Sequence, residues 1–206
     1  MPAALHVGTF LIFAALALLI VASISAPTVS RISFLNVAVA NGSSVHFGSL
    51  GYCVAMEQGN SCTPTGVGYK IADEIAAIGI NSFSSVKAAS LHGLTEGLIL
   101  HQIAAGITGI AFLLAVCSHR LGYLFASAVA FIAFLFSLAA LIIDFITFGS
   151  VKDHVHKNNG SAVYGNAIWM VLAATIVLFF ASIATCFACV TARRHRRSTK
   201  GTAATY

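Results

Sequence analysis

Charged residues are scarce in this chain. Of its 206 residues, 8% are charged and only six are Asp or Glu. A soluble domain carries about 25% charged residues, so lipid must be the main solvent here. The formal net charge is +5, but five of the basic residues lie in the last fourteen positions, at Arg193, Arg194, Arg196, Arg197 and Lys200. This distribution indicates a cytoplasmic stop signal near anionic lipid and argues against nucleic-acid binding.

Enzyme motifs are missing as well. The sequence has no Ser/His/Asp set with a supporting motif, no HExxH, no P-loop and no Rossmann glycine pattern. Its apolar stretches lack a central string of charges and show no repeated half, which argues against a transporter. We therefore expect no catalysis and no metal or other cofactor.

Apolar sequence is abundant, at 58% of the residues. Four stretches are long enough to cross the roughly 30 Å hydrocarbon core as helices: residues 7–25, 94–117, 121–146 and 165–190. With these spans, the sequence predicts a membrane domain over residues 1–192 that has two outer loops, 27–92 and 147–164. A short basic tail follows at 193–206. A cleaved signal peptide is the alternative for the first stretch, but its length and the lack of a preceding Lys or Arg favour an uncleaved span.

The basic cluster places the C-terminus in the cytoplasm. Four spans then place the N-terminus in the cytoplasm and both loops outside. Two N-x-S/T sequons fall in these loops, at Asn41 and Asn159, and are candidate glycosylation sites. Cys117, Cys186 and Cys189 fall at the inner ends of spans, where palmitoylation and inert apolar packing both remain open.

The first loop contains Gly48-Ser49-Leu50-Gly51-Tyr52-Cys53, followed by Cys62. Residues 28–40 and 44–54 alternate roughly and are rich in β-branched side chains, which predicts two strands of a small antiparallel sheet. Apolar residues at helical spacing predict a short helix over 69–80. Because the loop lies in oxidising space, we expect a Cys53–Cys62 disulfide, contributing about 3 kcal/mol, rather than two free thiols. No Cys or His at ligand spacing supports a zinc site there.

Small residues predict how the spans pack, because lipid is as apolar as leucine and close backbone approach requires small side chains. Three seams recur at spacings of three, four, seven or eight residues, which keep small side chains on one helix face: Gly97, Ala105 and Gly109; Ala126, Ala130, Ala133, Ser137 and Ala140; and Ala174, Ala181, Ala184 and Ala188. They indicate a tight, left-handed bundle.

Two ionisable residues interrupt these seams. His101 lies on the Gly97 stripe and Asp144 extends the Ser137 stripe, both in the outer half of the membrane. A charged Asp exposed to lipid costs at least a few kcal/mol, so both should face the bundle or the outer water. A pH-responsive His101–Asp144 pair is one hypothesis; a structural hydrogen-bonded pair, or two independent groups reaching water, is the other. His154 and His156 are expected to be solvated surface residues.

The sequence resembles the fungal PalI family over residues 7 to about 190. The resemblance is carried by Ser23 to Pro27, by Gly51-Tyr52-Cys53 with Cys62, by Gly68-Tyr69, and above all by the second span from Leu94 through His101 to Cys117. It implies an all-α membrane fold: a claudin-like four-transmembrane helix bundle with a small disulfide-clipped extracellular β subdomain in the first outer loop. Claudin-like proteins have a Gly-Leu-aromatic stretch before two cysteines in the first outer loop. Leu50-Gly51-Tyr52-Cys53 stands in that place here, without the tryptophan typical of claudins.

The resemblance also implies a non-catalytic plasma-membrane protein that assists alkaline-pH signalling by supporting a separate multi-span sensor. Under this hypothesis the bundle binds spans of that sensor through its small-residue seams. The alternative is an organiser of eisosome-associated membrane patches, through self-association and acylation of the inner cysteines. Many PalI members carry a long cytoplasmic tail; with 206 residues, we expect no tail-dependent recruitment. The expected partners are the lipid bilayer and either a pH sensor or further copies of the chain.

Overall fold

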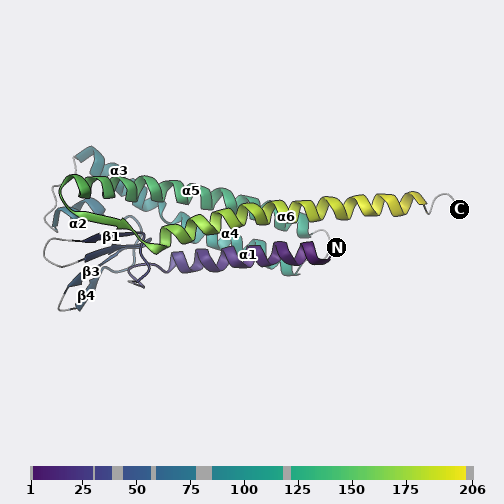
Figure 1. The fold of residues 1–206 in the computed structure, drawn as a ribbon, viewed down its shortest axis with the longest axis horizontal. Helices are drawn as coiled ribbons and strands as arrows, with labels where there is room; N and C mark the ends of the chain where they lie inside the picture. Colours follow the sequence, from purple (N-terminus) through teal and green to yellow (C-terminus); the bar gives the residue numbers. More distant parts are fainter. Residues whose placement is uncertain are drawn as a thin grey trace.

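The computed structural model describes residues 2–29, 31–38, 44–56, 59–77, 85–117 and 122–202. Four apolar helices lie side by side, and a small sheet caps one end of the bundle (Figure 1). They are α1 (Pro2–Ser23), α4 (Leu100–Cys117), α5 (Gly122–Lys157) and α6 (Asn166–Thr202). Helix α1 begins, and α6 ends, at the end of the bundle away from the sheet (Figure 1).

Within the described residues, three helical segments are long and apolar enough to cross a membrane, Ala89–Cys117, Phe125–Lys157 and Asn166–Phe187, and Val7–Ser23 is a shorter apolar segment. Together with the sheet and a Cys53–Cys62 disulfide, they confirm the predicted fold class, a claudin-like helical membrane bundle with a small β subdomain.

Small side chains fill the interior of the bundle. The five predicted seam residues of α5, from Ala126 to Ala140, are all buried, and so are Ala174 and Ala181 of α6. A hydrogen bond of 2.7 Å joins Ser137 Oγ to Thr175 Oγ1 between these two helices. The described seam residues of α5 and α6 are therefore largely occupied within the chain. The idea that these seams bind the spans of a partner is wrong for these buried positions.

The predicted seam of the second span is displaced around the helix. Gly97, Ala105 and Gly109 are only half-buried, whereas the deeply buried stripe of α4 consists of His101, Ala104, Thr108, Ala111 and Ala115. A Cβ atom added at Gly97 would lie 3.1 Å from the side chain of Ile143 on α5. Gly97 therefore still permits close contact between the helices.

Helix α5 is longer than the predicted span, which ended at residue 146. It has 36 residues, or about 54 Å at a rise of 1.5 Å per residue, and it continues well past the thickness of the hydrocarbon core. Its last turns contain many polar residues, but Phe148, Val151 and Val155 recur at helical spacing and are fully buried under the sheet. Most of the predicted second outer loop is therefore amphipathic helix.

Helix α3 (Ser85–Gly97) precedes α4 and is separated from it by a break at Leu98 and Ile99. The second apolar segment thus starts before the predicted residue 94. The short helix α2 (Ile71–Ala77) lies within the predicted 69–80 helix. Helix α6 continues through Thr202, past the predicted end of the fourth span at residue 190.

The sheet has five antiparallel strands in the order β4-β3-β2-β1-β5. They are β1 (Leu35–Ala38), β2 (Ser44–Phe47), β3 (Tyr52–Met56), β4 (Gly59–Cys62) and β5 (Ser161–Tyr164). The single strand predicted over 44–54 is wrong, because the chain reverses at residues 48–51. Strand β5 comes from the second loop and pairs with β1, so that both loops build one sheet.

The glycine-rich turn between β2 and β3 docks on the end of α1. The Ser49 amide donates to Ser25 Oγ at 3.0 Å, and the Ser49 hydroxyl donates to the Ser23 carbonyl at 3.2 Å. A Cβ atom added at Gly48 would lie 2.0 Å from the Ala26 carbonyl oxygen, so only glycine permits this approach. The turn therefore fixes the sheet to the first helix, while the disulfide joins β3 to β4.

Candidate functional site: a buried histidine–aspartate pair

His101 in the first turn of α4 and Asp144 in α5 meet at the sheet end of the bundle. Nε2 of His101 lies 3.1 Å from Oδ2 of Asp144, and both side chains are 0% exposed. The two residues that interrupt the predicted seams are therefore in direct contact. A buried pair of this kind is costly to separate, because either group left alone would be a polar or charged group without a partner.

The break between α3 and α4 positions the imidazole. Leu98 lies at this break, and its carbonyl oxygen is 2.9 Å from Nδ1 of His101. A carbonyl oxygen can only accept, so Nδ1 carries a proton and donates it. The backbone amide of His101 donates to the same oxygen at 3.2 Å. The ring is thus held with Nε2 directed at the carboxyl group.

The contact between Nε2 and Oδ2 is a hydrogen bond only when one proton lies between them. That proton can reside on the imidazole, giving an imidazolium and a carboxylate, or on the carboxyl group, giving two neutral groups. Both arrangements have zero net charge. Loss of the proton leaves one buried negative charge, and gain of a second leaves one buried positive charge.

An aromatic contact links this pair to the sheet. The ring of Phe34, the residue before β1, lies edge-on to the imidazole with centroids 5.1 Å apart. Phe34 also stacks on Phe148 of α5, with ring centroids 5.4 Å apart. The Phe34 amide donates to the Phe47 carbonyl of β2 at 2.7 Å. A displacement of the imidazole would therefore shift Phe34 and, through it, the start of β1 and the end of β2.

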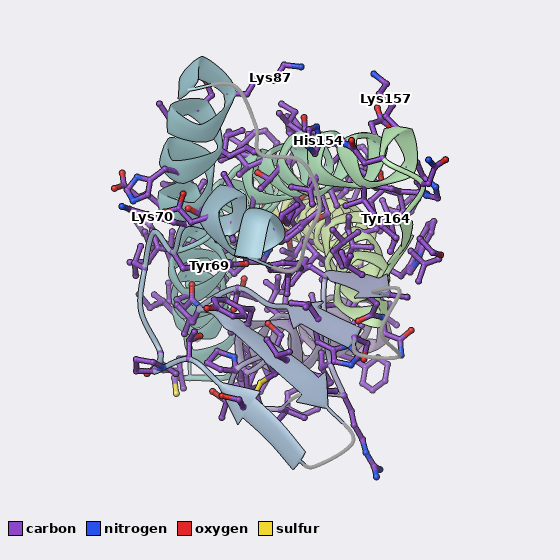
Figure 2. The ribbon with its side chains drawn as sticks, turned by 90° about the vertical axis from the view of Figure 1, so that its left-hand side faces the viewer. Tyr69, Lys70, Lys87, His154, Lys157 and Tyr164 are labelled. Atoms are coloured by element: carbon purple, nitrogen blue, oxygen red, sulfur yellow. A yellow bond between two sulfur atoms is a disulfide. The ribbon has the colours of Figure 1, made fainter. Side chains whose placement is uncertain are left out.

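Tyr69 is a further titratable group that interacts with Asp144. Burial, and to a lesser extent the charge of Asp144, raises the pKa of the Tyr69 phenol. Its hydroxyl donates to the Gly48 carbonyl at 2.7 Å, and Figure 2 shows the residue between α2 and the sheet. In the sequence, Tyr69 is part of the family resemblance and the first residue of the predicted 69–80 helix, and neither feature signals such burial.

Two buried oxygen atoms beside the pair have no hydrogen-bond partner among the described residues: Oδ1 of Asp144 and Oγ1 of Thr147. A buried acceptor in this condition costs about 1–3 kcal/mol. The carboxyl group of Asp144 is thus held by His101 alone through a described contact. Its stability in the bundle depends on the shared proton.

Two other predicted site residues, Cys117 and Cys186, are exposed free thiols. The side chain of Cys189 lies outside the described residues, as does Asn41. Asn159 is exposed in the turn before β5, with φ of 60°. Within the described ranges, no three His, Cys, Asp or Glu side chains gather as metal ligands.

The comparisons with known proteins point to one family. The sequence model of the SUR7/PalI family matches residues 4–192. The "pH-response regulator protein palI/prr-5" of Neurospora crassa is 31% identical over 183 residues, covering 85% of this chain and 24% of the relative. The "pH-response regulator protein palI/RIM9" of Yarrowia lipolytica is 30% identical over 179 residues, covering 84% and 21%. The chain thus spans about a quarter or less of the length of these relatives, and by its match over nearly the whole of its own length it belongs to the SUR7/PalI family.

Proposed function

We propose that this chain is a non-catalytic pH-response regulator of the plasma membrane, which supports a separate multi-span pH sensor. The observation that carries the proposal is the His101–Asp144 pair, a buried group that shares one proton and touches the base of the sheet through Phe34. Its relatives in Neurospora crassa and Yarrowia lipolytica are named pH-response regulators. Under this proposal, the pair responds to external pH and the sheet transmits the response.

The proposed orientation places the sheet outside and both termini in the cytoplasm. It is supported by the basic residues of 193–200, which lie in the last turns of α6, the helix that ends away from the sheet (Figure 1). The disulfide of the sheet suits an oxidising compartment. The sequon at Asn159 lies on the same side as the disulfide, and we propose that it is glycosylated.

The mechanism follows from the proton count. While the shared proton is present, the pair is neutral and ties α4 to α5. Alkaline medium withdraws the proton, leaving a carboxylate that faces the lone pair of Nε2, with Oδ1 already lacking a described partner. Repulsion then weakens the contact between α4 and α5 beneath Phe34 and the sheet.

Among the described residues, few other ionisable groups lie near the His101–Asp144 pair. Tyr69 is the titratable group that shares an electrostatic interaction with Asp144. Glu96 and His92 of α3 lie 3.6 Å from each other on the surface of the helix. The described parts of α1, α6 and β1 beside the pair contribute no charged side chain. The burial of Tyr69 keeps its phenol protonated in mildly alkaline medium, so the proposed transition belongs to His101 and Asp144.

The test uses a strain lacking the chain's gene, complemented with the wild type, with His101→Gln, or with His92→Gln. His92 is partly exposed on α3 and serves as the matched control. We expect the wild type and His92→Gln to restore alkaline growth and the surface level of the sensor, and His101→Gln to restore neither fully. If the deletion strain itself shows unchanged alkaline growth and an unchanged surface level of the sensor, the proposed function is refuted.

A second candidate function is an organiser of membrane patches. The observation that favours it is the exposure of the thiols of Cys117 and Cys186, because juxtamembrane thiols of this kind are acylated in many membrane proteins. Replacement of Cys117, Cys186 and Cys189 by Ser should then disperse immobile puncta of a tagged copy. Puncta that persist in the triple variant exclude a role for acylation.

A further inference from the structure

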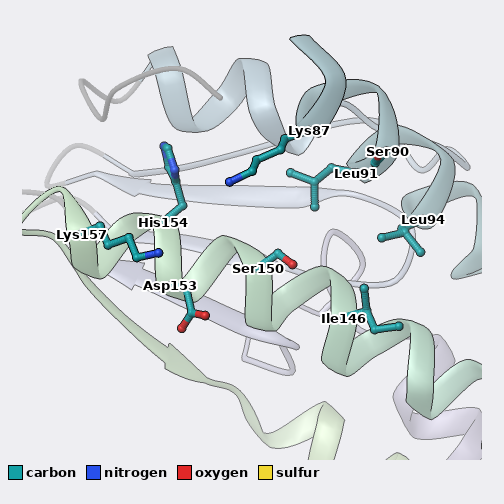
Figure 3. Close-up of a pocket in the computed structure, with 9 residues that line it drawn as sticks. All are labelled: Lys87, Ser90, Leu91, Leu94, Ile146, Ser150, Asp153, His154 and Lys157. Carbon is teal, nitrogen blue, oxygen red and sulfur yellow. The ribbon is translucent and has the colours of Figure 1, made fainter. Parts of the chain in front are cut away.

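A groove of about 330 Å³ separates α3 from α5 at the sheet end of the bundle. It contains neither member of the His101–Asp144 pair. Figure 3 shows side chains from both helices directed into this space. It is lined by Lys87, Ser90, Leu91, Leu94, Ile146, Ser150, Asp153, His154 and Lys157.

The α5 wall changes from apolar to cationic along its length. Ile146 lies at the end toward the bundle and is 50% exposed. Ser150 follows one turn further, then His154, then Lys157 near the end of the helix. Since residues three or four apart lie on one helix face, these side chains form a continuous stripe. Ile146 also continues the exposed apolar surface of α5 that includes Ile142 and Phe145, so the stripe begins at the lipid-facing surface.

The α3 wall carries the same gradient in the opposite chain direction. Leu94 lies opposite the apolar end, Leu91 and Ser90 follow, and Lys87 lies toward the outer end (Figure 3). Figure 2 shows Lys87, His154 and Lys157 together on one side of the sheet end, away from Lys70. The two walls therefore match. Apolar side chains of α3 and α5 face each other near the bundle, and basic side chains of the two helices face each other further out.

The facing cations would repel each other unless an anion lies between them. Lys87 and Lys157 contribute two positive charges and Asp153 one negative charge, so these three side chains have a formal charge of +1. A phosphodiester carries one negative charge. An acyl chain attached to it would leave the groove past Leu94 and Ile146 toward the hydrocarbon.

We propose that this groove binds one phospholipid of the adjacent leaflet, with its phosphodiester between Lys87 and Lys157. The first part of one acyl chain lies over Leu94 and Ile146. The volume is in the range of small-ligand sites and admits a head group with the start of a chain, not a whole lipid. This site is independent of the proposed role in pH response, because it uses neither His101 nor Asp144.

The experiment uses the full chain purified in detergent and titrated with dioleoyl-phosphatidylglycerol, with bound lipid counted by native mass spectrometry. The Lys87→Gln/Lys157→Gln variant tests the cations. The Lys70→Gln/Lys152→Gln variant is the matched control, because Lys70 pairs with Asp73 and Lys152 lies over the ring of Tyr164, both outside the groove. All four lysines are at the sheet end, so the two variants lose the same charge from the same region.

We expect the groove variant to bind the lipid about fivefold more weakly, since each exposed charge contact contributes modestly, and the control variant to bind as the wild type does. Diacylglycerol, which lacks the phosphate, and glycerophosphoglycerol, which lacks the chains, should both bind weakly to the wild type. Equal affinity of the groove and control variants would overturn the proposal. Tight binding of glycerophosphoglycerol would also overturn it, because the site would then be for a free phosphodiester.

Discussion

Removal of the carboxyl group of Asp144 should destabilise the bundle strongly. The Asp144→Ala change leaves the imidazole of His101 fully buried, with Nε2 deprived of its only described partner. Interhelical hydrogen bonds within membranes contribute about 0.6 kcal/mol on average, whereas breaking a buried ionic pair in a protein core costs about 3–5 kcal/mol. The second figure applies better, because the pair is covered by protein, with Phe34 against the imidazole. We expect a loss of about 3 kcal/mol, which lowers the melting temperature by about 6–12 °C in a chain of this size.

The assay is thermal unfolding of the purified chain in detergent, in a double-mutant cycle. Asp144→Ala and His101→Leu are compared with the double variant His101→Leu/Asp144→Ala. Since the double variant leaves neither a buried imidazole nor a buried carboxyl group without its partner, it should recover most of the loss. Asp144→Asn keeps the shape and can still donate to Nε2, so it should lie within about 1 kcal/mol of the wild type. A melting temperature for Asp144→Ala close to that of the wild type, or a double variant less stable than both single variants, would refute the reasoning.

Three predictions concern the sheet. Cys53→Ser should lower stability by about 3 kcal/mol in non-reducing buffer, measured by proteolysis of the outer loop, whereas Cys186→Ser, an exposed thiol, should change nothing. Because burial lowers the pKa of His46, the unfolded chain takes up protons before the folded chain does; stability of the sheet should fall as the pH drops below about 6.5, and His46→Gln should remove this dependence in the same assay. Gly48→Ala should prevent normal folding because its Cβ would meet the Ala26 carbonyl, and Gly66→Ala, with open space around it, should fold normally; equal yields of the folded protein on size-exclusion chromatography would contradict this.

The sequence predicts the parts of the fold that depend on local composition. Uncharged stretches of sufficient length predict the spans, and two cysteines in an outer loop predict the disulfide. His101 and Asp144 could be selected as a candidate pair because both interrupt small-residue stripes at the same depth. Their contact is a matter of three-dimensional packing, since the spacing alone does not fix the rotation of α4 against α5.

The features that sequence reasoning missed depend on contacts between distant segments. Strand β5 has only four residues and forms an edge of the sheet by pairing with β1, which no local pattern near residue 161 indicates. The sequence predicts a polar loop in place of the last turns of α5, because Gly, Ser and charged or polar residues separate Phe148, Val151 and Val155. The contact of Phe34 with the imidazole joins residues on two different elements, and a single sequence carries no signal for it.

The central claim is that His101 and Asp144 share a proton and that its loss changes the structure at the start of the sheet. Nuclear magnetic resonance of the full chain in lipid nanodiscs, with labelled histidine and phenylalanine, tests this claim most directly. Between about pH 5 and pH 9, the account predicts that Nδ1 of His101 keeps its proton while the Nε2 signal passes through a transition, and that the Phe34 amide signal shifts at the same pH. A transition at His101 without any shift at Phe34, or no transition at His101 over this pH range, would contradict the account.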